Sequence, residues 1–210
     1  MISIIDYGSG NISSVYNAFQ HIGCRVKVCT EAKDLLNADK IVLPGVGASR
    51  EAMNRLRDGG FIEPLLENIA KGRPFLGICL GLQLLLSRSF EFGENSCLNL
   101  IEGEVKRFPP SEGLKVPQIG WNTVKFTERA SPIFKGVRDE SYFYFVHSYY
   151  CDVKDPVFKA GETEYGFFYT SAVCKDNIYA VQFHPERSQE NGLKILRNFD
   201  KLRRSYRLLI

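Results

Sequence analysis

A cysteine between two glycines, placed where the chain changes from strand to helix, is the first candidate for chemistry. The continuous apolar run before it predicts a buried strand, and the leucine-rich segment after it predicts a helix. Gly77 and Gly81 flank Cys79 at two residues on either side. This spacing is that of a nucleophile elbow, a turn so tight that a side chain at either flank would clash. It predicts a cysteine nucleophile at the carboxyl end of a strand, against the alternative of a buried structural cysteine in a glycine turn.

The surroundings of Cys79 could activate it. The amino end of a helix carries partial positive charge and free N–H groups, which favour a thiolate and can bind a developing oxyanion. The N–H of Leu80, the residue after the nucleophile, is one such donor. A second donor is expected from Pro44–Gly47, at the end of another predicted strand, because its two glycines allow a peptide N–H to point into the site. A plain strand–helix turn is the alternative for this loop.

A thiol nucleophile also needs a base and a group that orients the base. His184 is one of three histidines and directly follows the predicted strand Ile178–Phe183. Pro185 stiffens the turn, and Glu186 can then reach the imidazole. Cys79, His184 and Glu186 therefore form a candidate triad, whereas a surface His-Pro turn is the alternative for the second segment.

The elements that must position these groups alternate in the first half of the chain. Predicted strands at 2–6, 26–29, 40–43 and 75–78 alternate with helices at 12–22, 51–56 and 61–70, and a glycine turn is expected at 7–11. Such alternation with short turns predicts a parallel sheet covered on both faces, where sites lie beyond the carboxyl ends of the strands.

The second half predicts an antiparallel extension of that sheet. Strands are expected at 105–108, 122–126, 142–150, 167–169, 172–175 and 178–183, with a hairpin turn at 175–177, and a closing helix from about Glu190 to Tyr206. We expect one α/β domain with a mixed sheet, spanning residues 1–210.

Composition excludes several functional classes. The chain has 210 residues, 44% hydrophobic and 24% charged, and its net charge of +3 is too small to argue for nucleic acid. No apolar stretch is long enough to span a membrane and the first residues lack a signal-peptide pattern, so a cytoplasmic location is expected. The six cysteines form no C-x-x-C pair, and no metal or nucleotide cofactor is expected.

The segments 77–83 and 183–186 resemble the class I (triad) glutamine amidotransferases. Within that family, five further stretches are most similar to the glutaminase subunits of imidazole glycerol phosphate synthases: 6–11, 43–48, 119–122, 145–149, and Gly192-Leu193 before Asn198-Phe199. The resemblance covers nearly the whole chain. It implies a three-layer α/β/α, flavodoxin-like fold with a mixed, mostly parallel central sheet, and it implies no cofactor.

The resemblance also implies a mechanism. The Cys79 thiolate would attack the side-chain amide of glutamine, His184 would transfer protons, and Glu186 would hold His184. Backbone N–H groups of Leu80 and Gly47 would form the oxyanion hole. A thioester would form and then be hydrolysed, releasing ammonia and glutamate.

Further site residues follow from the same resemblance. The residues implied to contact glutamine are Gln83, His147 and Ser148. The implied partner is a separate synthase (cyclase) subunit, a β/α barrel that forms a heterodimer with this chain and receives the ammonia. The residues that match positions at that interface are Asn11, Trp121 and Tyr144.

Three positions depart from the family's usual pattern: Ser49 replaces a common Phe, Gln118 a common His, and Arg187 a common Lys. None belongs to the triad. Paralogues of this subunit feed ammonia to surface-sugar amidotransferases, and that acceptor is an alternative. A non-catalytic assembly subunit and a stand-alone cysteine hydrolase are further alternatives, which the triad and Gly120-Trp121-Asn122 respectively disfavour.

Overall fold

The computed structural model describes residues 1–8, 11–110, 114–127 and 131–204. The predicted glycine turn at 7–11 is therefore only partly covered, because Ser9 and Gly10 lie outside the described residues. No helix among the described residues is long and apolar enough to cross a bilayer.

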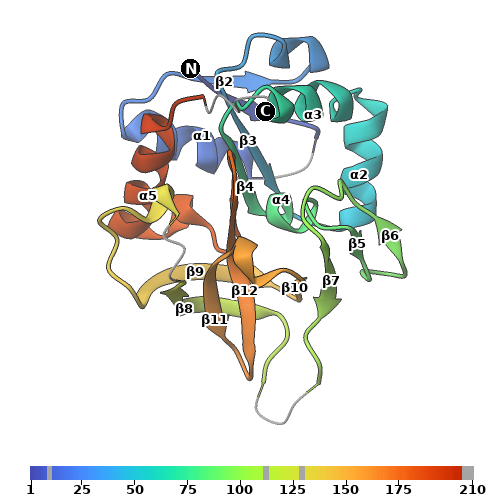
Figure 1. The fold of residues 1–210 in the computed structure, drawn as a ribbon, viewed down its shortest axis with the longest axis vertical. Coiled ribbons are helices and arrows are strands. Elements are labelled where there is room, and N and C mark those ends of the chain that lie inside the picture. Colours follow the sequence, from blue (N-terminus) through green and yellow to red (C-terminus); the bar gives the residue numbers. More distant parts are fainter. Residues whose placement is uncertain (9–10, 111–113, 128–130, 205–210) are drawn as a thin grey trace.

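Strands and helices alternate in the first half of the chain, as predicted (Figure 1). In order, these elements are β1 (Ile2–Ile5), α1 (Ile12–His21), β2 (Val26–Cys29), the 3₁₀ helix η1 (Ala32–Leu35), β3 (Lys40–Gly45), α2 (Ser49–Asp58), α3 (Ile62–Ala70), β4 (Phe75–Cys79) and α4 (Leu80–Gln83).

The second half is mostly strand. Its elements are β5 (Arg88–Ser89), β6 (Asn95–Ser96), β7 (Gly103–Arg107), β8 (Gln118–Phe126), η2 (Pro132–Phe134), β9 (Ser141–His147), β10 (Tyr149–Val153), η3 (Pro156–Phe158), β11 (Lys159–Glu164), β12 (Phe168–Lys175), β13 (Ile178–Val181), η4 (Pro185–Arg187) and α5 (Gln189–Lys201).

The sheet is mixed, with a parallel centre. Its main order is β2-β1-β3-β4-β13-β12-β10-β7-β5-β6, and β11, β8 and β9 branch from β12. β2, β1, β3, β4 and β13 pair in parallel, whereas β12, β10 and β7 continue the sheet in antiparallel pairs. Because β4 and β13 are parallel neighbours, their carboxyl ends bring the segments of Cys79 and His184 to the same edge.

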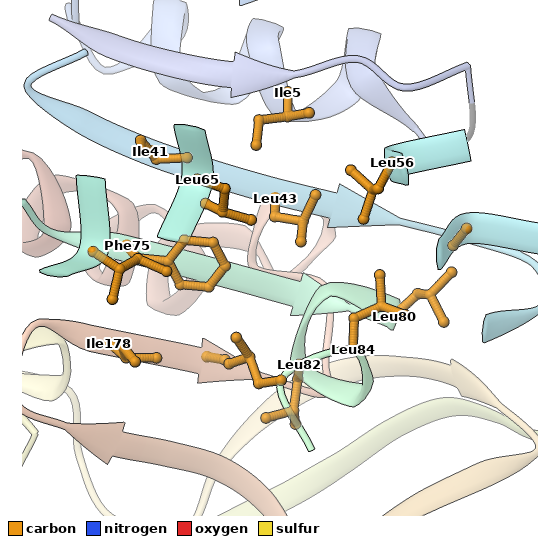
Figure 2. Close-up of a cluster of buried hydrophobic side chains, with 14 of the residues drawn as sticks. Ile5, Ile41, Leu43, Leu56, Leu65, Phe75, Leu80, Leu82, Leu84 and Ile178 are labelled. Atoms are coloured by element: carbon orange, nitrogen blue, oxygen red, sulfur yellow. The ribbon is translucent and has the colours of Figure 1, made fainter. Parts of the chain in front are cut away.

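Helices cover both faces of the parallel strands. Successive strand residues enter different core clusters, as Ile4 and Ile5 or Val42 and Leu43 do, because side chains alternate across a strand. One cluster lies under α2 and α3 and takes in Leu80, Leu82 and Leu84 (Figure 2). The other includes the buried residues of α1 and α5. The three-layer α/β/α expectation is therefore confirmed.

Several predicted boundaries differ from the structure. The predicted strand at 142–150 is two strands, β9 and β10, which separate at Ser148. The closing helix ends at Lys201 rather than near Tyr206, since Leu202 is already extended and Tyr206 lies outside the described residues. β11 was not predicted, because its sequence is largely polar and lacks clear alternation.

The tight turn at Cys79 gives a prediction about stability. A Cβ on Gly81 would lie 1.9 Å from the backbone oxygen of Leu43 in β3. Gly81→Ala should therefore lower the free energy of unfolding by about 3 kcal/mol or more, because β3 and α4 must separate to admit the methyl group. Urea denaturation measures the change.

Gly136→Ala is the matched control. Gly136 has φ +74° and open space where the Cβ would go, so its substitution should cost only about 1 kcal/mol of backbone strain. Equal losses for the two variants would contradict a steric role for Gly81.

Candidate active site

Cys79 occupies a strained turn between β4 and α4. Its φ of 55° and ψ of −106° are unusual for a residue with a side chain. A Cβ on Gly77 would lie 2.7 Å from the backbone oxygen of Gly81, so neither flanking glycine can carry a side chain. The elbow geometry predicted from the spacing is therefore present.

The helix after Cys79 is shorter than the sequence predicted. α4 spans only Leu80–Gln83, and turns follow it. A helix of one turn carries little macrodipole, so any stabilisation of negative charge at this point must come from individual N–H groups. The N–H of Leu80, the first residue of α4, is in position to be one of them.

His184 and Glu186 form a buried pair. Imidazole Nδ1 lies 2.8 Å from Glu186 Oε1, and the side chains are 4% and 0% exposed. Burial alone lowers the pKa of His184, but interactions with Cys79 and with Glu186 outweigh it and raise that pKa from 6.5 to about 10. Nε2 is also buried and makes no close hydrogen bond with any described residue. This nitrogen is free to take a proton and return it.

The turn that holds His184 is tied to β9 through the backbone of Tyr144. The His184 N–H donates to the Tyr144 carbonyl at 2.9 Å, and the Tyr144 N–H donates to Ser188 Oγ at 3.0 Å. Ser188 Oγ in turn donates to the His184 carbonyl at 2.6 Å. This closed set of hydrogen bonds fixes the histidine turn against the strand, and no sequence pattern had identified Ser188.

A cavity of about 590 Å³ opens beside Cys79. It is lined by all the residues predicted to bind glutamine or the oxyanion, together with the nucleophile: Gly47, Cys79, Leu80, Gln83, His147 and Ser148. Gly47 has φ +93°, a conformation that favours glycine, and a Cβ there would meet nothing within 4 Å. The two residues predicted to supply N–H donors, Leu80 and Gly47, thus line one cavity.

Gln83 and His147 direct their side chains inward. Gln83 Nε2 lies 3.2 Å from the Tyr149 carbonyl and 3.1 Å from Gln182 Oε1. His147 Nδ1 lies 2.7 Å from the same carbonyl, and burial lowers the pKa of His147 to about 4. These hydrogen bonds within the protein hold the side chains of Gln83 and His147 in place in the cavity wall.

Two charged residues of the cavity were not predicted. Glu91 and Arg107 both line it and carry opposite charges. Glu91 Oε2 accepts from the Ser49 N–H at 2.8 Å and from Ser49 Oγ at 3.1 Å. Ser49, the departure from the common Phe, therefore holds a carboxylate at the cavity. A single glutamate in an irregular segment carries no periodic signal that could have identified it.

The other departures also have structural partners. Gln118 is buried, and its Oε1 accepts from the Tyr169 hydroxyl at 2.9 Å. That hydroxyl lies 3.2 Å from Nε2 of His147. The Arg187 guanidinium lies 6.0 Å from the centre of the Tyr144 ring.

Two of the three residues predicted at a partner interface, Trp121 and Tyr144, border the histidine turn. Trp121 and Tyr144 are cross-strand partners on β8 and β9, with ring centres 6.0 Å apart in an edge-to-face arrangement. Trp121 is 46% exposed, and its neighbours Ile119 and Tyr142 are also exposed. Asn11 occupies the N-cap position of α1 without a side-chain capping hydrogen bond, and α1 contacts η4. Trp121 and Tyr144 thus lie together on an apolar, partly exposed surface.

Among the residues that the structure describes, no group of three His, Cys, Asp or Glu side chains could hold a metal ion. The described cysteines are all free thiols. Burial raises the pKa of Cys97 to about 11, and burial together with Asp200 does the same for Cys24.

Comparisons with known proteins agree with this geometry. Residues 3–202 match the model of the family "Glutamine amidotransferase class-I". The chain is 50% identical to imidazole glycerol phosphate synthase subunit HisH of Syntrophotalea carbinolica, over 95% of this chain and 98% of the relative. It is also 50% identical to the subunit of the same name from Geobacter sulfurreducens, over 96% and 99% of the two chains.

Solved structures share the fold at lower identity. PurLQS from Thermotoga maritima superposes with a TM-score of 0.75 at 16% identity, covering 94% of this chain and 96% of the other. A structure described as a glutamine amidotransferase superposes with a TM-score of 0.73 at 17% identity, with the same coverage.

The buried His147 gives a prediction about pH dependence. Its pKa is about 4 when folded and 6.5 when exposed, so between these values the unfolded chain binds a proton that the folded chain does not. The contribution of neutral His147 to the free energy of unfolding is fully present above pH 6.5. It should be lost as the pH falls to 4, which lowers that free energy by about 3 kcal/mol.

The measurement is urea denaturation at pH 4 to 6.5 for wild type and His147→Gln, in which this part of the slope should disappear. His21→Gln, at an exposed residue of α1, is the control and should keep the wild-type slope. An unchanged slope in His147→Gln would contradict the assignment.

Proposed function

Since the chain belongs to the class-I glutamine amidotransferase family, we propose that it is the glutaminase subunit of an imidazole glycerol phosphate synthase, acting in the cytoplasm as one domain of residues 1–210. The geometric observation that carries the proposal is the buried His184–Glu186 pair at the same sheet edge as Cys79, and Cys79 itself lines a cavity. The names of the relatives with 50% identity over nearly the whole chain supply the choice of synthase.

Cys79 performs the first chemical step in this proposal. Its thiolate attacks the side-chain amide carbon of glutamine, and the carbonyl oxygen gains negative charge. The N–H groups of Leu80 and Gly47 stabilise that oxygen. As the C–N bond breaks, protonated His184 gives its proton to the departing nitrogen, which leaves as ammonia.

Hydrolysis of the resulting thioester completes the cycle. Neutral His184 takes a proton from a water molecule, whose oxygen attacks the thioester carbon. The C–S bond breaks, glutamate leaves and the Cys79 thiolate returns. Glu186 keeps the imidazole in one orientation through both steps and stabilises its protonated form.

The charged residues of the cavity suit the other end of the substrate. Free glutamine carries an α-ammonium and an α-carboxylate group. We assign the ammonium to Glu91, whose carboxylate Ser49 holds in place, and the carboxylate to Arg107. Gln83, His147 and Ser148 complete the wall that encloses the side chain.

The partner is a synthase subunit that consumes the ammonia. The proposal includes its β/α-barrel fold and a heterodimer in which Trp121, Tyr144 and Asn11 contact it. Exposed aromatic side chains are favoured anchors of protein interfaces, and Trp121 with Tyr144 provides them next to the histidine turn. Direct transfer is useful because ammonia in bulk water at neutral pH is mostly ammonium, which is not nucleophilic.

Replacement of the nucleophile tests the catalytic assignment. Cys79→Ala should reduce glutamine hydrolysis by more than about a hundredfold, because no covalent intermediate can form. In the reconstituted complex it should still allow synthesis from added ammonium salt, since the partner's site is unchanged. Glutamate and the synthase product are measured together.

Cys24→Ala is the matched control and should retain both activities, because Cys24 lies in the α1–α5 core region and not at the cavity. Retention of more than about a hundredth of wild-type hydrolysis in Cys79→Ala would refute the nucleophile. Loss of ammonium-dependent synthesis would show that this chain does more than supply ammonia.

The docking surface gives a second test. Trp121→Ala should weaken binding to the synthase subunit by about 2 kcal/mol or more, and the ratio of product to glutamate should fall as ammonia escapes. Titration calorimetry measures the affinity. Leu36→Ala, at another exposed apolar residue next to η1, should change neither quantity. Unchanged affinity and ratio in Trp121→Ala would place the interface elsewhere.

A further inference from the structure

A chain of hydrogen bonds inside the protein ends on the sulfur of Cys79. Gln182 follows β13 directly and is fully buried. Its Nε2 lies 3.6 Å from Cys79 Sγ, within hydrogen-bond range for sulfur. Its Oε1 lies 3.1 Å from Gln83 Nε2, which is also 3.2 Å from the carbonyl of Tyr149.

The Tyr149 carbonyl, the last group in this series of hydrogen bonds, determines the orientation of both amide groups. A backbone carbonyl can only accept, so Gln83 must present its NH₂ group to Tyr149. The second hydrogen of that NH₂ group then points to Gln182, whose side-chain oxygen must accept it. The NH₂ group of Gln182 is therefore the one that faces Cys79.

A second donor reinforces the same orientation. The thiol of Cys151, which is buried on β10, lies 3.9 Å from Gln182 Oε1. Burial raises the pKa of Cys151 well above its usual value, so this sulfur keeps its proton and can act only as a weak donor to a carbonyl oxygen. Gln182 Oε1 thus receives hydrogen bonds from two sides, and a flipped amide would place NH₂ against both donors.

A hydrogen bond from an N–H group to the sulfur stabilises the thiolate and the thiol to different extents. A hydrogen bond to an ionised acceptor is stronger than one to a neutral acceptor, so it favours the thiolate over the thiol. Because the amide is neutral, it adds no charge that would compete with His184 for the sulfur. The same bond weakens when the sulfur is acylated and strengthens when the C–S bond breaks.

We propose that Gln182 is a further catalytic residue, which donates a hydrogen bond to Cys79 Sγ and stabilises its thiolate. The part played in breaking the thioester rests on the proposed glutaminase function, whereas the effect on the free thiolate does not. Gln83 and Tyr149 act as positioning groups, which hold the donor side of Gln182 toward the sulfur.

Alkylation of Cys79 measures the thiolate without any substrate. Iodoacetamide reacts with the thiolate, and mass spectrometry of the peptide containing Cys79 follows that residue alone among the six cysteines. The rate is measured from pH 5 to 10 on the full chain. Gln182→Met, which removes the donor, should move the midpoint of the pH profile upward by about one pH unit.

Gln182→Glu sharpens the test. It is nearly isosteric and can still accept from Gln83, but it places a carboxylate oxygen where the donor was. The midpoint should move further upward than in Gln182→Met. Cys151→Ala is the control, because it removes a neighbour of Gln182 while Gln83 still fixes the amide, and its midpoint should stay within a few tenths of a unit of wild type.

The midpoints of the pH profiles decide whether the proposed role of Gln182 holds. Wild-type midpoints in the Gln182 variants that fold would overturn the proposal, as would an equal shift in Cys151→Ala, since the effect would then come from packing. If Gln182→Glu does not fold, Gln182→Met decides. A shifted midpoint in a chain that does not hydrolyse glutamine would support the inference and refute only the glutaminase function.

Discussion

One close backbone approach sets the position of the nucleophile. β3 and α4 come so near that the Cα of Gly81 faces the carbonyl of Leu43 with no room for a methyl group. The chain can reach α4 from β4 only by turning at Cys79 through a conformation that side chains rarely adopt. The buried side chains of Leu80, Leu82 and Leu84, which follow the turn, pack in the cluster that also contains Leu43 (Figure 2). Core packing thus supports the strain at Cys79.

The polar groups near Cys79 are of two kinds. His184 is held by Glu186 and by the backbone of β9, and it can carry charge and exchange a proton. Gln182 and Gln83 are neutral amides whose hydrogen bonds leave each a single orientation. In the proposed mechanism, a mobile proton and a fixed dipole together stabilise a thiolate without a permanent second charge in the core, which would be costly to bury.

The sequence predicted those parts of the structure that depend on local pattern. The elbow follows from the spacing of two glycines about Cys79, and the hairpin follows from the turn residues Asp176 and Asn177 between β12 and β13. The break between β9 and β10 was not predictable, because the strand-forming segment from 142 to 150 contains no glycine or proline that would mark a turn. There, the Ser148 carbonyl turns to accept a hydrogen bond from the N–H of Phe108, which is remote in sequence. Gln182 was missed for a similar reason, since its partner Gln83 is 99 positions away.

The ring and the backbone of Tyr144 make separate contacts. Its ring lies beside Trp121 at the exposed side of β9, while its N–H and carbonyl hold the turn that carries His184. Main-chain hydrogen bonds do not depend on which side chain a residue carries, with proline the exception. This position can therefore change its side chain while the histidine stays anchored. If the ring contacts a partner as proposed, the partner contact and the catalytic geometry can change independently of each other.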